Sequence, residues 1–225
     1  MRASGALRPV TVDDVDRAER CRRGRIVLID DEASVREAFG LLLAQEGYAV
    51  DAYPSAVDFL AATAENQASF PGPVCVLSDV KMPEQTGLAM LRQVAAADAP
   101  PVVLMSGASG PAEVVEAFRG GVFDFLLKPI HPDALLSTVR RALDAHTDRE
   151  AAQRQQEDRR QRVGALTPRE REVIALVAQG EINRVIGARL GISLRTVKLH
   201  RHHAMEKLGV DNVADLAVLA QEAGL

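Results

Sequence analysis

The chain contains no tryptophan, and aromatic residues make up only 4% of its 225 positions. That scarcity argues against a large ligand pocket lined by aromatic rings. The two cysteines, Cys21 and Cys75, do not suggest a disulfide framework, because one lies in a polar leader and the other within an apolar strand pattern. No segment approaches the length of an apolar membrane span, and the first residues lack the apolar core of a signal peptide. These absences favour a cytoplasmic protein with no membrane partner.

Charge is distributed unevenly along the chain, although its net value is only −4. Residues 25–145 contain 8 Lys+Arg and 16 Asp+Glu, a net charge of −8, whereas residues 166–225 contain 8 and 7, a net charge of +1. Such a difference indicates separate modules with different partners. We therefore expect a flexible leader over 1–24, an acidic domain over 25–145, a linker over 146–164 and a second domain over 165–225.

Short apolar runs alternate with helix patterns in the acidic part of the chain. The runs predicted as strands are Arg25–Ile29, Ala49–Tyr53, Val74–Asp79, Val102–Met105 and Asp124–Leu127. Helices are expected over 34–46, 55–64, 86–97, 111–119 and from Pro132 onward, and Ser34 to Glu37 reads as a capping box that opens the first. This alternation predicts an α/β fold with a doubly wound, five-stranded parallel sheet.

Polar side chains stand at the ends of four predicted strands. Asp30 and Asp31 follow the first, Asp79 ends the third, Ser106 follows the fourth and Lys128 follows the fifth. Ligand sites of doubly wound sheets lie at the carboxyl ends of the strands, so these groups are expected to converge. Clustered carboxylates need a cation, and all-oxygen ligands suit Mg²⁺. Asp79 alone could simply start a turn, which aspartate often does.

A carboxylate beside a bound Mg²⁺ can act as a nucleophile toward a phosphoryl group. Lys128 would neutralise the charge on the transferring oxygens, and Ser106 would donate a hydrogen bond to one of them. The sequence thus predicts phosphoryl chemistry at this edge of the sheet.

The segment from Pro132 to Arg162 continues as one helical pattern. Its first part carries an apolar stripe that would pack on the sheet, formed by Leu135, Leu136, Val139 and Leu143. The stripe stops beyond Ala145, and residues 148–162 are almost wholly charged or Gln, which is typical of an exposed spacer helix. We interpret it as a helical linker whose arginines form a solvated face rather than a DNA contact.

Four helices are expected in the last part of the chain, over 168–179, 183–190, 194–208 and 213–223. Thr167 caps the first, with Pro168 and Glu170 in its first turn, and Ser193 caps the third. Two short helices joined by a turn at Gly191 form a helix-turn-helix. The outward residues of the third helix suit phosphates and base edges, although an exposed polar face is the alternative; they are Arg195, Lys198, Arg201 and His202.

Several motifs resemble the receiver domain of two-component response regulators over about residues 25–145. They are Asp30-Asp31, Ser78-Asp79-Val80-Lys81-Met82-Pro83, Met105-Ser106-Gly107 and Leu127-Lys128-Pro129. The resemblance implies a flavodoxin-like fold with Asp79 as phospho-acceptor from a histidine kinase. Asp30, Asp31, Asp79 and the Lys81 carbonyl would hold Mg²⁺. Ser106 and Phe125 would act as switch residues, and the Lys128–Pro129 peptide would be cis.

Residues 166–225 resemble the LuxR-type helix-turn-helix of the NarL/FixJ response regulators. The resemblance rests on Thr167-Pro168-Arg169-Glu170, Asn183-Arg184, Leu190-Gly191-Ile192-Ser193, Thr196-Val197-Lys198 and Lys207-Leu208. It implies DNA contacts through Arg184, Arg195, Thr196, Lys198, Leu199 and His202, and a dimer contact through Val213, Leu216 and Ala217. The scaffold helix departs from the family pattern at Gly187, which should cost it about 1 kcal/mol relative to Ala.

The sequence therefore predicts a DNA-binding transcriptional response regulator that dimerises when Asp79 is phosphorylated, with RNA polymerase as a further candidate partner. It would not act as an enzyme beyond Mg²⁺-dependent self-phosphorylation and autodephosphorylation. One alternative is a regulator of the same fold that works without phosphorylation. Another is a Mg²⁺-dependent phosphohydrolase, which would need a second acid where Lys81 stands. The third is a LuxR-type sensor of a small ligand, disfavoured by the few aromatics.

Overall fold

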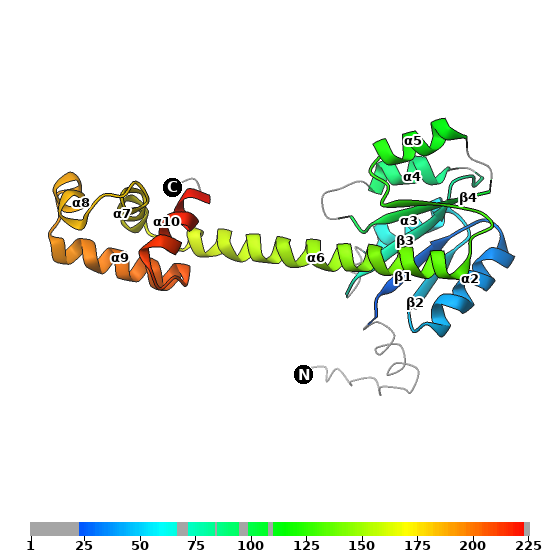
Figure 1. Ribbon diagram of the computed structural model, residues 1–225, viewed down its shortest axis with the longest axis horizontal. Helices are drawn as coiled ribbons and strands as arrows, with labels where there is room; N and C mark the ends of the chain where they lie inside the picture. The colour runs from blue at the N-terminus through cyan, green and yellow to red at the C-terminus, as the bar shows by residue number, and fades with distance from the viewer. Residues whose placement is uncertain (1–22, 67–71, 84, 95–98, 108–109, 223–225) are drawn as a thin grey trace, which may run out of the picture. The chain divides into compact units, whose positions relative to one another are not determined.

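The computed structural model describes residues 23–66, 72–83, 85–94, 99–107 and 110–222, and it divides the chain into two compact units, Met1–Glu150 and Ala151–Leu225 (Figure 1). The predicted leader lies almost wholly outside the described residues. Among those that are described, no helix is both long enough and apolar enough to cross a bilayer.

The first unit is a parallel sheet with helices on both faces. Its strands are β1 (Arg25–Ile29), β2 (Ala49–Tyr53), β3 (Val74–Asp79), β4 (Val102–Ser106) and β5 (Asp124–Leu127). They pair in the order β2-β1-β3-β4-β5, and all four pairings are parallel. The helices are α2 (Ala33–Gln45), α3 (Ala56–Asn66), α4 (Gly87–Val94), α5 (Pro111–Arg119) and the first part of α6 (Pro132–Gly164). The predicted doubly wound α/β fold is confirmed.

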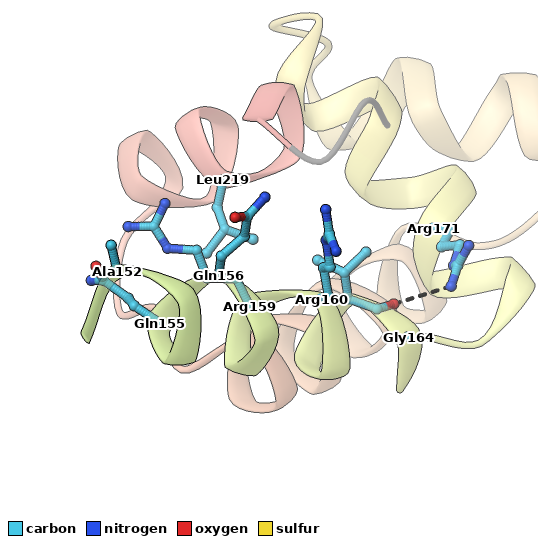
Figure 2. Close-up of a pocket in the computed structure, with 9 residues that line it drawn as sticks. Ala152, Gln155, Gln156, Arg159, Arg160, Gly164, Arg171 and Leu219 are labelled. Carbon is cyan, nitrogen blue, oxygen red and sulfur yellow. Dashed lines mark hydrogen bonds between the residues drawn. The ribbon is translucent and has the colours of Figure 1, made fainter. Parts of the chain in front are cut away.

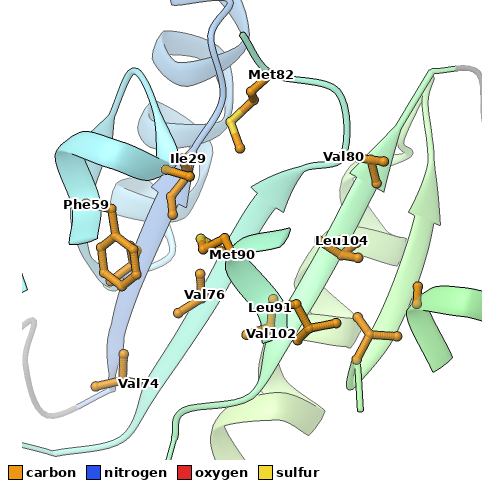
Figure 3. Close-up of a cluster of buried hydrophobic side chains, with 14 residues drawn as sticks. Ile29, Phe59, Val74, Val76, Val80, Met82, Met90, Leu91, Val102 and Leu104 are labelled. Carbon is orange, nitrogen blue, oxygen red and sulfur yellow. The ribbon is translucent and has the colours of Figure 1, made fainter. Parts of the chain in front are cut away.

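Two apolar layers hold this sheet between its helices, because successive residues of a strand point to opposite faces. Val27, Val76 and Leu104 belong to one layer, where Phe59 of α3 and Met90 of α4 pack against the sheet (Figure 3). Residues one position along the strands, such as Ile26, Leu28 and Leu77, form the other layer with α2 and α6. The two apolar layers therefore hold in place the edge of the sheet at which the strands end.

The start of α2 differs from its prediction. The helix begins at Ala33 with Glu32 at the N-cap position, and no side chain caps it, so the predicted capping box at Ser34 and Glu37 is wrong. The reason lies one turn earlier, where Asp30 Oδ1 accepts a hydrogen bond from the Glu32 amide at 3.0 Å and sets the turn. Helix α4 ends at Val94 in the structure, whereas the predicted extension to residue 97 falls on residues outside the described part.

Helix α6 begins at Pro132, as predicted, and its buried stripe reaches one turn further than the apolar pattern indicates. Val139 and Leu143 are buried against the sheet, and His146 continues the same face with only 7% exposure. Its Nδ1 accepts a hydrogen bond from the amide of Val74, the first residue of β3, at 3.3 Å. Arg149 donates to the Ala99 carbonyl at 3.0 Å. Both contacts hold α6 to the end of the sheet where the strands begin.

The second unit combines the end of α6 with α7 (Pro168–Ala178), α8 (Asn183–Leu190), α9 (Leu194–Leu208) and α10 (Val213–Glu222). The predicted capping box of α7 is present, with Thr167 and Glu170 bonded reciprocally at 2.8 and 3.3 Å. Ser193 caps α9 by accepting from the Thr196 amide at 3.1 Å. Helices α8 and α9 are joined through Gly191, whose φ of +66° favours glycine. The expected helix-turn-helix is thus formed.

Candidate functional site

Three of the predicted site residues meet at the carboxyl edge of the sheet. The Lys128 ammonium lies 2.7 Å from Asp30 Oδ2 and 2.6 Å from Asp79 Oδ1. Asp30 is fully buried and Asp79 is 6% exposed. The second oxygen of Asp79 accepts a hydrogen bond from the Lys81 amide at 2.7 Å. The structure therefore brings two carboxylates and one ammonium into direct contact at the carboxyl ends of β1, β3 and β5.

The electrostatics of this cluster favour a charged lysine. Burial acts to lower the pKa of Lys128, but hydrogen bonds and charges from Asp30 and Asp79 outweigh it and raise the pKa above its usual value. The Lys128 amide also donates to the Ser106 carbonyl at 2.7 Å, and the Lys128–Pro129 peptide is cis, as expected. One ammonium against two carboxylates leaves the cluster with a negative charge, which an added cation would offset.

The remaining predicted residues surround this cluster. Ser106 ends β4 and is 1% exposed, so its hydroxyl is held at the edge of the sheet. Phe125 is half-buried and packs on the layer that contains α4. Asp31 is exposed beside Asp30. Among the described residues no three metal-ligating side chains are gathered into one site. The donors nevertheless suit Mg²⁺, which keeps several of its waters and needs few protein oxygens.

Two residues that support the site were not singled out from the sequence. Arg36 donates from Nη1 to the carbonyls of Asp30 and Asp31 at 2.6 and 2.9 Å, which fixes the acidic loop. Gly87 starts α4 so close to β3 that a β-carbon there would lie 2.3 Å from the Asp79 carbonyl oxygen. The sequence did contain a sign of this close approach, because a glycine stands at the start of a helix eight residues after Asp79.

The predicted DNA-contacting residues of the second unit are mostly at its surface. Five of them are exposed, namely Arg184, Arg195, Lys198, Leu199 and His202. Thr196 is half-buried and its hydroxyl lies 2.7 Å from that of Ser193. Arg201 is half-buried too, and its Nη1 donates to Asn183 Oδ1 at 3.4 Å, so it joins α9 to α8 rather than projecting freely. Arg195, Lys198, Leu199 and His202 follow one another at helical spacings of three, four and seven residues, so they share one side of α9, which together with the exposed Arg184 of α8 we call the basic face.

Helix α9 is tied to its neighbours within the unit. Lys207 donates to Glu170 Oε2 at 2.7 Å, and Glu170 is 4% exposed. Burial acts to raise the pKa of Glu170, but the bonds from Lys207 and Thr167 outweigh it and lower that pKa. Arg162 of α6 donates to the Leu208 carbonyl at the end of α9, at 3.2 Å. These contacts fix the orientation of the basic face.

Two predictions for this unit need correction. Leu216 is 0% exposed and belongs to the core, so it is not a surface contact for a dimer; Val213 is 43% exposed, and the Ala217 side chain lies outside the described part. Gly187 does not merely weaken α8. A β-carbon there would lie 2.8 Å from the Ile192 carbonyl oxygen, so glycine lets the turn after α8 approach the helix closely.

Comparisons with known proteins agree with this arrangement. Residues 26–140 match the model of the response regulator receiver domain, and residues 164–220 match the bacterial regulatory proteins of the LuxR family. The chain is 32% identical over 206 residues to the transcriptional regulatory protein FixJ of Bradyrhizobium diazoefficiens, covering 90% of this chain and 97% of that protein. It is 33% identical to the C4-dicarboxylate transport transcriptional regulatory protein DctR of Rhodobacter capsulatus, covering 84% of this chain and 95% of that one.

Solved structures show the same relationship. The response regulator StyR has a TM-score of 0.79 at 31% identity, covering 88% of this chain and 98% of its own. Full-length FixJ from B. japonicum has a TM-score of 0.51 at 31% identity, covering 89% and 97%. The two domain types imply a histidine kinase and promoter DNA as partners. The chain belongs to the two-component response regulators that join a receiver domain to a LuxR-type helix-turn-helix, and it is a DNA-binding transcriptional regulator.

Proposed function

We propose that Asp79 is the phospho-acceptor through which a histidine kinase controls this regulator. The observation that carries the proposal is that the Lys128 ammonium, at the carboxyl edge of the sheet, contacts both Asp79 and Asp30, at 2.6 and 2.7 Å. An oxygen of Asp79 would attack the phosphorus of the kinase's phosphohistidine. The phosphorus–nitrogen bond would break, and its electron pair would return to the imidazole.

The residues around Asp79 would each support that transfer. Lys128 would neutralise charge on the phosphoryl oxygens, and Ser106 would donate its hydroxyl to one of them. The Lys81 amide, 2.7 Å from Asp79 Oδ2, orients the carboxylate. Mg²⁺, when bound by Asp31, Asp79 and the Lys81 carbonyl with Asp30 assisting, would supply the positive charge that the cluster lacks. The chemistry would be confined to Asp79 itself, as self-phosphorylation and autodephosphorylation.

Phosphorylation would then favour a receiver dimer through the face formed by α5 and β5. Ser106 and Phe125 would be the residues that respond to the phosphoryl group. A complete reversal of a two-state population from 1:99 to 99:1 would need about 5.5 kcal/mol, so a partial shift assisted by dimerisation is sufficient in our scheme. The dimer would bind promoter DNA in the cytoplasm, where it could contact RNA polymerase. The domain limits that we propose remain 25–145 and 165–225, with a helical linker over 146–164.

The test is labelling by a small phosphodonor, such as acetyl phosphate, with and without Mg²⁺. Wild-type protein should gain one phosphoryl group by intact-mass measurement, and Asp79→Asn should gain none. Asp144→Asn, an exposed aspartate on α6, is the matched control and should be labelled like wild type. Full labelling of Asp79→Asn would refute the assignment of the acceptor. No labelling of the wild type by any donor would favour the phosphorylation-independent regulator instead.

We further propose that the basic face of α8 and α9 binds the major groove. Lys198 and Leu199 are exposed there, Leu199 with 50% of its surface, and Arg195 of α9 and Arg184 of α8 are exposed too. Lys198→Ala should weaken binding to a selected DNA site and lower the salt slope by about 1 if Lys198 contacts a phosphate, whereas a base contact would cost about 1–3 kcal/mol at one position. The control is Arg189→Ala, since Arg189 of α8 is paired with Glu181 at 3.0 Å. This variant should keep the DNA affinity and the salt slope of wild type.

A further inference from the structure

The second unit contains a basic pocket that none of the roles above uses. It has a volume of about 610 Å³ and lies between the end of α6, the start of α7 and α10 (Figure 2). Its lining residues are Ala152, Gln155, Gln156, Arg159, Arg160, Val163, Gly164, Arg171 and Leu219. All of them belong to one compact unit, so the pocket does not depend on the placement of the first unit. Its volume falls within the range of ordinary small-molecule sites.

The lining carries positive charge with no acid among its residues. Arg159 and Arg160 come from α6, and Arg171 comes from α7. The carboxylates next to them in sequence have other partners, since Asp158 pairs with Arg162 at 2.8 Å, Glu172 with Arg169 at 2.6 Å and Glu170 with Lys207 at 2.7 Å. Arg160 and Arg171 therefore bring two guanidinium groups to a lining without a carboxylate, which raises the local potential and would attract an anion.

The pocket is also shaped in advance. Arg171 donates from Nη2 to the Val163 carbonyl at 3.2 Å, which fixes its guanidinium over the junction of α6 and α7. That junction is short and held by the capping box of α7, and Leu166 within it is 5% exposed. A guanidinium whose position is already fixed loses less freedom when it binds a carboxylate or a phosphate.

The lining also contains apolar side chains. Leu219 of α10 and Val163 of α6 are half-buried and pack on the core of the unit. Figure 2 shows Leu219 and Gln156 side by side above α6, with the arginines on either side. Gln155 and Gln156 add neutral hydrogen-bonding groups. An ion alone would leave the apolar part unused, whereas a ligand with a charged head and a hydrocarbon body matches both parts of the lining.

We propose that this pocket binds a small amphiphilic anion, with a carboxylate or phosphate head on an aliphatic body. Arg160 and Arg171 would hold the head, because planar guanidinium groups bind both kinds of head in a bidentate manner. Leu219 and Val163 would contact the body. Since Leu219 belongs to α10, the bound ligand would connect α6 and α7 to the helix that carries Val213. The proposal does not rest on phosphorylation of Asp79.

The test is calorimetric titration of the full chain with octanoate and octyl phosphate, which separate the two head groups. We expect saturable binding of at least one of them at a single site. Acetate, inorganic phosphate and octyltrimethylammonium should each bind at least about tenfold more weakly than the octyl anion. The first two lack the apolar body whose burial contributes to binding, and the third cannot accept a hydrogen bond from a guanidinium group. Equal affinity for any of these three would overturn the proposal, as would the absence of binding by both octyl anions.

Variants locate the site. Arg160→Gln combined with Arg171→Gln should weaken binding of the octyl anion by at least about tenfold, on the same estimate for charged hydrogen bonds. Arg154→Gln, on the same helix but outside the lining, is the matched control and should bind like wild type. Circular dichroism and thermal melting confirm that each variant is folded. Wild-type affinity in the double variant would overturn the proposal, even if that variant bound DNA with a reduced salt slope, because the arginines would then serve DNA phosphates.

Discussion

Replacement of His146 should make the receiver unit less stable and should change how its stability depends on pH. His146 lies in α6 with 7% exposure, and its Nδ1 accepts the Val74 amide hydrogen bond at 3.3 Å. Acceptance at Nδ1 requires the neutral imidazole with its proton on Nε2. His146→Phe fills the space of the ring but removes the acceptor, so the buried Val74 amide loses its partner. The expected cost is about 1–3 kcal/mol of the free energy of unfolding.

The sign of the pH dependence follows from the pKa of His146. Burial lowers this pKa, with the nearby Arg149 charge acting in the same direction and Glu150 opposing it. The unfolded chain therefore binds a proton at higher pH than the folded chain. The stabilisation is fully present above the unfolded pKa of about 6.5, and it is lost as the pH falls from there through the folded pKa.

The assay can report on this unit alone, because the chain has two tyrosines and no tryptophan. Both Tyr48 and Tyr53 belong to the first unit, so urea unfolding followed by tyrosine fluorescence measures that unit within the full chain. His146→Asn keeps an acceptor near the place of Nδ1 without a titrating ring, and it should lose less stability than His146→Phe. His203→Asn, an exposed site in the other unit, is the control.

The quantity to compare is the difference in unfolding free energy between wild type and His146→Asn as a function of pH. This difference cancels the carboxylates that both proteins share. It should favour wild type least at acid pH, grow as the pH rises from the lowered pKa of folded His146 toward about 6.5, and stay constant above that value. A difference that stays constant from acid to neutral pH, or a His146→Phe protein as stable as wild type, would refute the role of the Val74 hydrogen bond.

Three further predictions concern other contacts. Lys128→Met should destabilise the receiver by about 3–5 kcal/mol, because it leaves the buried carboxylates of Asp30 and Asp79 without a positive partner. Mg²⁺ should then raise the urea midpoint of this variant more than that of wild type. Gly187→Ala should not gain the roughly 1 kcal/mol that helix propensity predicts, because its β-carbon would meet the Ile192 carbonyl at 2.8 Å; a gain of that size in calorimetry of the second unit would contradict the contact. Glu170→Gln should cost that unit about 1–3 kcal/mol at neutral pH through the weakened Lys207 bond. The loss should shrink as the pH falls through the lowered pKa of Glu170, and an equal loss at all pH values would count against it.

The sequence was sufficient to predict the sheet and the edge where Asp30, Asp79 and Lys128 meet. Parallel strands deliver their last residues to one edge, so the pattern of strand ends predicts the gathering without any knowledge of distances. His146 could have been found as well, since it lies three residues beyond Leu143 on the same helical face. It was missed because its ring is polar and the apolar stripe ends before it.

The errors arose where a pattern has two readings. Helix α10 has apolar residues on two faces, and periodicity alone does not choose between Leu216, which is buried, and Val218, which is 57% exposed. Helix propensity treats Gly187 as a defect, because it considers the helix without the turn that packs against it. In both cases the deciding information is the position of a neighbouring element, which local sequence does not contain.

The contact between Gly87 and Asp79 has a consequence for mutational tolerance. A β-carbon at position 87 would lie 2.3 Å from the Asp79 carbonyl and 3.1 Å from the Ser78 hydroxyl, so every other residue would displace either the end of β3 or the start of α4. A saturation screen for loss of signalling should therefore return position 87 as intolerant to all substitutions. The position of Asp79 thus depends on a neighbouring residue that has no side chain.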